Sequence, residues 1–171
     1  KQKTLHDGRY DLIANLPYYI ATNIILRAFE DSACENIIVM VQKEVAEKFT
    51  ARVKEKEYSS LGIITELISI DSRILFDVPP ESFDPPPKIM SSILFIKKDM
   101  DKVLDKDFNK FLKACFVQPR KKLSKNLTSV LSKEAISEIY KELNIDDNVR
   151  PHEVSSSLYS QMHTRVKDGR N

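Results

Sequence analysis

Short apolar runs recur through the first hundred residues, and polar or turn-forming residues bound each of them. The run at 36–42 is continuously apolar, as in a parallel strand that is covered on both faces. The other runs have a similar length, which favours strands over helices. The predicted strands are 9–14, 36–42, 72–78 and 91–98.

Three intervening segments instead space their apolar residues three and four positions apart, which predicts amphipathic helices. Thr22 or Asn23 can cap the start of the first one. Strands that alternate with helices indicate an α/β fold with a mostly parallel sheet. The predicted helices are 21–30, 43–52 and 61–69.

A proline-rich loop at 79–88 joins the last two predicted strands. This loop is too short to contain a crossover helix, so the two strands can only pair antiparallel. We therefore expect a mostly parallel sheet whose last strand is antiparallel.

The pattern changes after residue 99, where helical spacing continues and no strand is predicted. Pro119 and Pro151 separate the helical segments. We expect two domains, an α/β domain at 1–99 and a small all-helical domain at 100–171. The helical segments are 105–118, 121–131, 133–143 and 153–167.

The net charge of +2 is unevenly distributed between these domains. Residues 1–99 contain 13 Lys and Arg against 15 Asp and Glu, whereas residues 100–171 contain 14 against 10. A basic helical domain suggests an acidic partner, although a solvated helical surface would show the same bias.

The cysteines and glycines bear on metal binding, phosphate binding and cellular compartment. Cys34 and Cys115 lack metal-ligand spacing, so we predict buried thiols in a reducing compartment and no metal site. No signal peptide and no membrane-spanning apolar run is visible, which favours a cytoplasmic protein. The three glycines are too scattered to form a phosphate-binding loop.

The sequence Asn15-Leu16-Pro17-Tyr18 directly follows the first predicted strand. Ligands of open α/β sheets bind beyond the carboxyl ends of the strands. The Asn15 amide oxygen is one acceptor, and Pro17 favours an extended Leu16 whose carbonyl is a second. Two acceptors beside the Tyr18 ring suit a planar group with an exocyclic amino group, such as adenine. A plain strand-to-loop turn is the alternative interpretation.

Two later segments contain further residues that could bind a nucleic acid. Three prolines follow Phe83 closely, and a stiff loop could hold this ring against an extruded base or merely connect two strands. Four cations fall within six residues of the segment 118–127, where they could bind phosphates or form a solvated surface. These cations are Arg120, Lys121, Lys122 and Lys125.

In order and approximate spacing, five segments resemble the KsgA-type ribosomal RNA adenine N6-dimethyltransferases. The resemblance extends over essentially the whole chain. The matching segments are NLPYYI (15–20), VQKEVAEKF (41–49), FDPPPKIMSSI (83–93), FVQPRKKLSKNL (116–127) and RPHEVS (150–155).

This resemblance implies a Rossmann-like methyltransferase domain with S-adenosylmethionine as donor, followed by a helical rRNA-binding domain. The acceptors would be two adjacent adenosines near the 3′ end of 16S rRNA in the small ribosomal subunit. Asn15 would contact the donor and, with the Leu16 carbonyl, accept hydrogen bonds from the adenine amino group. Tyr18 and Phe83 would stack on the flipped base, and the four cations would bind rRNA. A monomer is the default expectation.

The sequence departs from the family pattern in two respects. Pro119 stands where many relatives carry a basic residue, which implies a slightly changed RNA-binding segment. The family's Gly-rich donor loop and its acidic ribose-binding residue precede the Asn-Leu-Pro-Tyr strand, and neither occurs in these 171 residues. We therefore expect the C-terminal two thirds of a family member, inactive by itself.

Three alternatives share part of the pattern. Large-subunit rRNA adenine methyltransferases of the antibiotic-resistance type usually have Ile at the position of Leu16, and DNA adenine methyltransferases generally have Pro there. A ribosome-assembly or RNA-binding factor without catalysis is the third. Intact Asn15, Tyr18 and Phe83 argue against it, because a pure binding protein would not need acceptors at the strand end.

Overall fold

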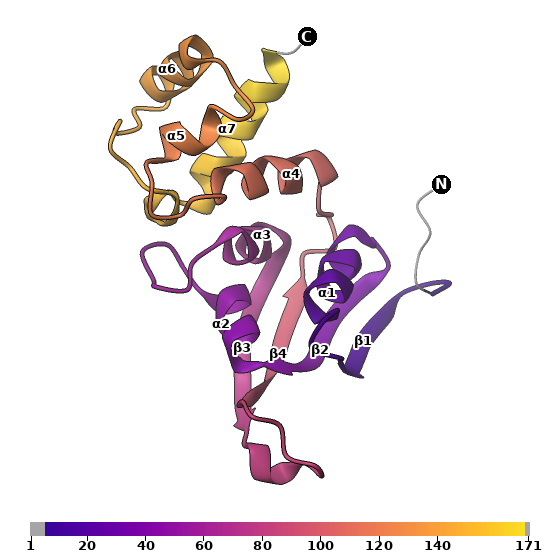
Figure 1. Cartoon of the computed structure of the whole chain (residues 1–171). Coiled ribbons are helices and arrows are strands. Elements are labelled where there is room, and N and C mark those ends of the chain that lie inside the picture. The colour runs from indigo at the N-terminus through magenta and orange to yellow at the C-terminus, as the bar shows by residue number, and fades with distance from the viewer. Residues whose placement is uncertain (1–5, 170–171) are drawn as a thin grey trace. The chain divides into compact units, whose positions relative to one another are not determined.

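The computed structural model describes residues 6–169 and divides the chain into two compact units (Figure 1). The first unit contains the residues up to 50 together with 68–104, and the second contains 51–67 together with the residues from 105 onward. The division differs from the boundary at residue 99 in its assignment of 51–67. Contacts within the second unit explain the difference: the Lys54 N–H, for example, donates to the His152 carbonyl at 3.1 Å.

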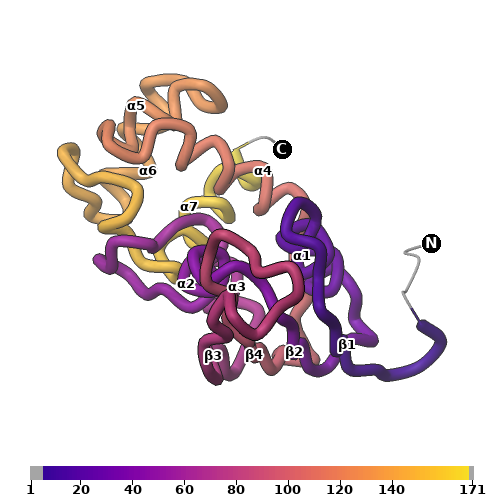
Figure 2. Tube along the Cα trace, turned by 60° about the horizontal axis from the view of Figure 1, so that its bottom comes forward, coloured from indigo at the N-terminus to yellow at the C-terminus, as the bar shows by residue number. Residues whose placement is uncertain are grey.

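The first unit contains a four-stranded sheet in the order β1-β2-β4-β3, which can be followed across Figure 2. β1 pairs with β2 in parallel, and β4 runs antiparallel to both of its neighbours. The predicted antiparallel last strand is therefore confirmed. The strands are β1 (Tyr10–Asn15), β2 (Cys34–Gln42), β3 (Ser69–Val78) and β4 (Ser91–Lys98).

The helices α1 (Ala21–Glu30) and α2 (Lys43–Thr50) lie on one face of this sheet (Figure 1). Phe29 of α1 and Phe49 of α2 pack edge to face with their ring centroids 6.1 Å apart. Alternate aliphatic residues of the two central strands are buried, because side chains alternate across a strand. The buried aliphatic residues of β2 and β4 are Ile37, Val39, Val41, Leu94 and Ile96.

A buried lysine of β4 donates hydrogen bonds to the C-terminal end of α1. Lys98 is 2% exposed, and its ammonium donates to the Ala28 carbonyl at 2.9 Å and to the Asp31 carbonyl. Carbonyls at a helix C-terminus lack intrahelical donors, so a cation there satisfies and stabilises them. Burial lowers the pKa of Lys98.

The described part of the second unit is helical and contains no strand, as predicted. Asp105, Ser132 and Ser155 cap α4, α6 and α7 through side chains that accept backbone N–H groups. The helices are α3 (Ser60–Ile68), α4 (Lys106–Cys115), α5 (Leu123–Leu127), α6 (Lys133–Glu142) and α7 (Ser156–Asp168). α5 is much shorter than the helix predicted at 121–131.

Cys34 and Cys115 are free and buried, as predicted. Among residues 6–169, no helix is long and apolar enough to cross a membrane. The same residues include no group of three or more His, Cys, Asp and Glu side chains that could hold a metal ion.

Candidate functional site

The chain leaves the sheet at Asn15, the last residue of β1, and enters α1 at Ala21. The N–H of Leu16 donates to the Met40 carbonyl of β2 at 3.3 Å, and the Leu16 side chain is only 6% exposed. The Pro17 carbonyl accepts from the N–H groups of Ile20 and Ala21, at 3.1 Å each, where α1 begins. The carboxyl end of β1 and the start of α1 therefore fix the backbone of Asn15, Leu16 and Pro17.

Two acceptors remain available at this position. Asn15 is exposed, and its side-chain amide has no hydrogen-bond partner among residues 6–169. The Leu16 carbonyl likewise accepts no hydrogen bond within that part of the chain. Both oxygens can therefore accept hydrogen bonds from a ligand.

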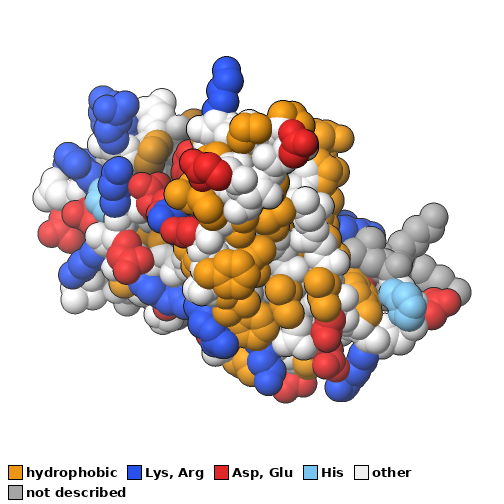
Figure 3. Space-filling view, turned by 90° about the horizontal axis from the view of Figure 1, so that it is seen from below, with side chains coloured by type: hydrophobic (Ala, Val, Ile, Leu, Met, Phe, Trp, Pro, Cys, Tyr) orange, Lys and Arg blue, Asp and Glu red, His pale blue; other side chains and the backbone are white. Residues whose placement is uncertain are grey.

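A cavity of about 340 Å³ lies between this turn and the loop that joins β3 to β4. Its volume falls within the range of small-molecule sites, roughly 300–1,000 Å³. The end of the first unit that carries this loop is rich in hydrophobic side chains (Figure 3). All five residues proposed from sequence line the cavity, which is formed by Asn15, Leu16, Pro17, Tyr18, Phe83, Pro85 and Pro87.

Phe83 lies in the cavity wall and is only partly buried, so the alternative of a core position does not apply. Its N–H donates to the Pro80 carbonyl at 3.1 Å, at the end of the short 3₁₀ helix Pro80–Ser82. Pro85 and Pro87 complete the same wall. The sequence indicated a stiff loop, whereas the direct lining role of these two prolines is a finding of the structure.

A buried serine fixes the Tyr18 ring. The hydroxyl oxygens of Tyr18 and Ser91 are 2.6 Å apart, and Ser91 is fully buried at the start of β4. Ser91 was not among the site residues predicted from the sequence. Two consecutive serines at the start of an apolar strand are a usable signal, because buried hydroxyl groups require partners.

A second polar network, centred on Asp77 of β3, includes an ion pair. Ser92 donates to a carboxylate oxygen of Asp77 at 2.7 Å, and the Lys43 ammonium lies 2.6 Å from the other oxygen. The hydrogen bond from Lys43, followed by that from Ser92, lowers the pKa of Asp77. The Lys43 N–H also donates to the Met90 carbonyl at 3.0 Å, so the network connects α2 to the end of the β3–β4 loop.

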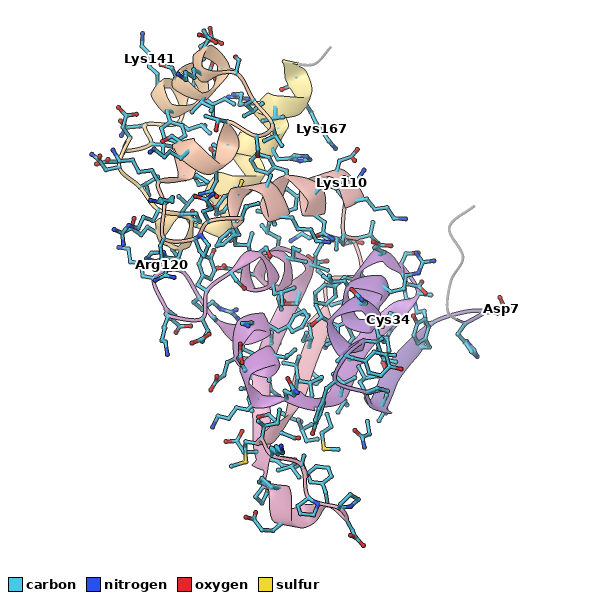
Figure 4. All side chains as sticks on the ribbon, viewed as in Figure 1. Asp7, Cys34, Lys110, Arg120, Lys141 and Lys167 are labelled. Atoms are coloured by element: carbon cyan, nitrogen blue, oxygen red, sulfur yellow. The ribbon has the colours of Figure 1, made fainter. Side chains whose placement is uncertain are left out.

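The four cations proposed for RNA binding belong to the second unit, and all of them are exposed. Figure 4 shows Arg120 on the connection between α4 and α5. Asn126 stabilises this connection from the core: its amide oxygen accepts from the Gln118 N–H at 2.8 Å, and its amide nitrogen donates to the Gln118 carbonyl at 3.1 Å. The charged side chains therefore extend from an ordered backbone.

The structure is an α/β protein with a cavity at the carboxyl end of a parallel strand. The profile of the Ribosomal RNA adenine dimethylase family matches residues 2–168, and the chain belongs to this family.

Relatives with assigned names agree with this membership. The chain is 82% identical over 171 residues to "Ribosomal RNA small subunit methyltransferase A" of Aliarcobacter butzleri, and it spans 64% of that protein's length. It is 50% identical over 167 residues to the protein of the same name from Sulfurimonas denitrificans, of which it spans 62%. The chain thus covers somewhat less than two thirds of these relatives.

Solved structures support the fold. A dimethyladenosine transferase from Plasmodium falciparum superimposes with a TM-score of 0.82 at 21% identity, covering 97% of this chain and 70% of that one. The 23S rRNA methyltransferase ErmE gives a TM-score of 0.65 at 16% identity, covering 96% and 68%. At these identities the similarity shows a shared fold.

Proposed function

We propose that the protein to which this chain belongs dimethylates N6 of two adjacent adenosines near the 3′ end of 16S rRNA, with S-adenosylmethionine as donor and a role in ribosome biogenesis. One observation carries the proposal: two unpaired acceptors, Asn15 and the Leu16 carbonyl, line one cavity with the rings of Tyr18 and Phe83. The names of the bacterial relatives support the small-subunit substrate.

The two acceptors address the central difficulty of the reaction. The amino lone pair of adenine is delocalised into the ring, which makes the nitrogen a poor nucleophile. Hydrogen bonds from both N–H groups to Asn15 and Leu16 favour a pyramidal nitrogen and free its lone pair. The same oxygens stabilise the positive charge that develops on nitrogen during transfer.

The rings of Tyr18 and Phe83 supply the binding surface for a base taken out of its stack. Aromatic side chains hold a flipped base by stacking and leave its edge open to polar contacts. Ser91 keeps the Tyr18 ring in place through its hydroxyl. Orientation of the amino group thus falls to Asn15 and Leu16, and retention of the base to the rings.

The lining contains no strong base. None of its seven residues is Asp, Glu, His, Lys or Arg. A methylated, positively charged amino group attached to an aromatic ring is acidic enough to lose its proton to water. The composition of the cavity therefore supports a mechanism without a general base.

S-adenosylmethionine supplies the methyl group. Within this chain, Asn15 is the residue suited to contact the donor, because its exposed amide both donates and accepts hydrogen bonds. Gly8, Gly62 and Gly169 do not line the cavity. We propose that the remaining donor contacts come from the part of the family's length that this chain does not span.

The helical second unit would bind rRNA through Arg120, Lys121, Lys122 and Lys125. Their exposed cations extend from a backbone that Asn126 fixes, and such contacts to phosphates dominate RNA affinity. We propose a domain boundary near residues 99–104, with the catalytic site in the first unit. A ribosomal substrate implies a cytoplasmic location, and a monomer suffices because the proposed contacts need no second copy.

The test uses the full-length protein, labelled S-adenosylmethionine and small ribosomal subunits that lack the modification. Label on two adjacent adenosines near the 3′ end of 16S rRNA is the expected result. Label on a large-subunit adenosine would contradict the substrate. Co-sedimentation with the subunit without any transfer would instead support a non-catalytic assembly factor.

A further inference from the structure

The loop that joins β3 to β4, residues 79–90, carries three of the seven residues that line the cavity. It projects beyond the end of the sheet (Figure 1). Inside the loop, the N–H groups of Ser82 and Phe83 donate to carbonyls three residues earlier, at 3.0 and 3.1 Å. These bonds shape the short 3₁₀ helix but do not join the loop to the sheet. The position of Phe83 therefore depends on how the two ends of the loop are held.

Lys43, the first residue of α2, connects this loop to the rest of the first unit. The Lys43 N–H donates to the carbonyl of Met90, the last residue of the loop, at 3.0 Å. Within residues 6–169, no other hydrogen bond joins the loop to a residue outside it. The preceding residue, Gln42, pairs with Ser91 in the sheet. The backbone of Lys43 is thus fixed by β2 before it and by α2 after it.

The side chain of the same lysine holds the other end of the loop. Asp77 lies two positions before the loop, and its carboxylate is 2.6 Å from the Lys43 ammonium. The second carboxylate oxygen accepts from Ser92, the strand partner of Asp77 on β4, at 2.7 Å. Lys43 therefore bonds to the chain at both ends of the loop, once through its backbone and once through its ammonium group.

The ion pair is better suited to positioning than to global stability. The side chains of Lys43 and Asp77 are 41% and 37% exposed, and ion pairs with such exposure contribute little to the free energy of unfolding. The hydrogen bond is nevertheless charge-assisted, and Ser92 orients the carboxylate that accepts it. The pair therefore restricts the loop more than it stabilises the fold.

We propose that Lys43 is a positioning residue for the cavity: with Asp77, it holds both ends of the β3–β4 loop so that Phe83 stacks on the target base. The proposal deepens the proposed function and rests on it. Neither Lys43 nor Asp77 lines the cavity, so both act through the loop. A loop freed at one end lets Phe83 move, and the base amino group then meets Asn15 less often. Small displacements of reacting groups lower the rate strongly.

Lys43→Met breaks the ion pair and leaves the backbone hydrogen bond to Met90 in place. Lys48→Met is the matched control, because Lys48 pairs with Glu44 at 2.5 Å on the same helix. In the full-length protein, hydrogen–deuterium exchange of the Phe83 amide should become about threefold to tenfold faster in Lys43→Met, the effect of losing one hydrogen bond. The control should leave it unchanged. Both variants should melt within a few degrees of the wild type.

Steady-state methylation of small subunits separates positioning from folding. Lys43→Met should lower kcat by about threefold to fivefold and leave KM for the subunit within about twofold, because the proposed rRNA contacts of the second unit are intact. Lys43→Arg retains a charged donor and should restore most of kcat. Asp77→Asn breaks the pair from the other side, retains an acceptor for Ser92, and should resemble Lys43→Met.

The outcomes separate this role from the proposed function. If Lys43→Met matches Lys48→Met in both exchange and kcat while the wild type methylates 16S rRNA, the positioning role is wrong and the proposed function stands. Faster exchange without a lower kcat, or a lower kcat without faster exchange, would also overturn the positioning role. A wild type that transfers no methyl group would refute the proposed function, and faster exchange in Lys43→Met would then confine the role of Lys43 to holding the loop.

Discussion

Tyr18 and Ser91, 73 positions apart in the sequence, share a hydrogen bond of 2.6 Å between their hydroxyl oxygens. Tyr18 follows β1, whereas Ser91 begins β4, so this bond connects the turn after one strand to the start of another. Because Ser91 is fully buried, its position is set by the sheet. The turn after β1 is thereby hydrogen-bonded to the core of the first unit.

Ser91→Ala should lower methylation by about tenfold, since a loosely held aromatic ring no longer fixes the target base. Tyr18→Phe removes the same hydrogen bond from the other side. If both single variants lose activity through the loss of this one hydrogen bond, the double variant Tyr18→Phe/Ser91→Ala should be about as active as the less active single variant. Steady-state kinetics of the full-length protein on small subunits would measure this.

Ser92→Ala is the control for the removal of a buried hydroxyl. Ser92 is equally buried but donates to Asp77 and makes no hydrogen bond with Tyr18. We expect Ser92→Ala and Ser91→Ala each to lower the free energy of unfolding by about 1 kcal/mol. Ser92→Ala should lower methylation less than Ser91→Ala does. Additive decreases in the double variant, or equal activity of Ser91→Ala and Ser92→Ala, would refute the positioning role of Ser91.

Asn15→Ala should abolish methylation while leaving binding to the small subunit largely intact. The change removes one of the two acceptors for the adenine amino group and leaves the cations of the second unit in place. The decrease should reach at least about 100-fold, as for an oxyanion-hole donor. Tyr19→Ala is the control within the same turn, because Tyr19 is 84% exposed and does not line the cavity. Near-normal turnover of Asn15→Ala would contradict the acceptor mechanism.

The ion pair of Lys43 and Asp77 predicts a pH dependence of stability. The folded pKa of Asp77 lies below its ordinary value of 3.8, and that of Lys43 lies above its ordinary 10.5. The Asp77 contribution is therefore present above pH 3.8 and is lost as pH falls through the folded value, whereas the Lys43 contribution is lost as pH rises above 10.5. Carboxyl NMR titration should give a midpoint below 3.8, and Lys43→Met should raise it. An unchanged midpoint in that variant would show that Lys43 is not the cause.

Lys98→Ala should destabilise the protein by about 2 kcal/mol, because the Ala28 and Asp31 carbonyls each lose a charged donor and keep only a backbone N–H. Its neighbour Lys97 is exposed, and Lys97→Ala should stay within about 0.5 kcal/mol of the wild type in urea unfolding. Burial lowers the folded pKa of Lys98 below 10.5, so this group makes stability increase with pH between the two values. Equal stabilities of the two variants would contradict the capping role.

The basic segment should act through phosphates. Replacing both Arg120 and Lys121 by Ala removes two exposed cations, and the log–log salt dependence of RNA affinity should become shallower by about 0.7–0.9 for each phosphate that is no longer neutralised. Lys110→Ala is the control, since this lysine is paired with Asp107. A salt dependence that is unchanged in the double variant would place the RNA-binding surface elsewhere.

Local periodicity was sufficient for most of the secondary structure. The predicted strand 91–98 and helix 21–30 match β4 and α1 residue for residue. An element that is buried on one face repeats its apolar residues at a fixed spacing, and this spacing can be read from the segment's own sequence. The helix predicted at 121–131 was wrong in length. The Thr128 hydroxyl donates to the Lys125 carbonyl, and the chain continues from α5 as turns. Such a side-chain hydrogen bond to the backbone competes with helix formation, and the spacing of apolar residues does not reveal it.

The sequence by itself determined five of the residues that line the cavity, Asn15, Leu16, Pro17, Tyr18 and Phe83, since they belong to local motifs with local conformational preferences. Only the tertiary structure decided that they share one cavity, that Ser91 holds Tyr18, and that β4 lies between β2 and β3. These relationships join segments far apart in the chain, and their geometry is set by how strands pair and side chains pack. The assignment of 51–67 to the helical unit has the same origin, because packing partners decide where a segment belongs.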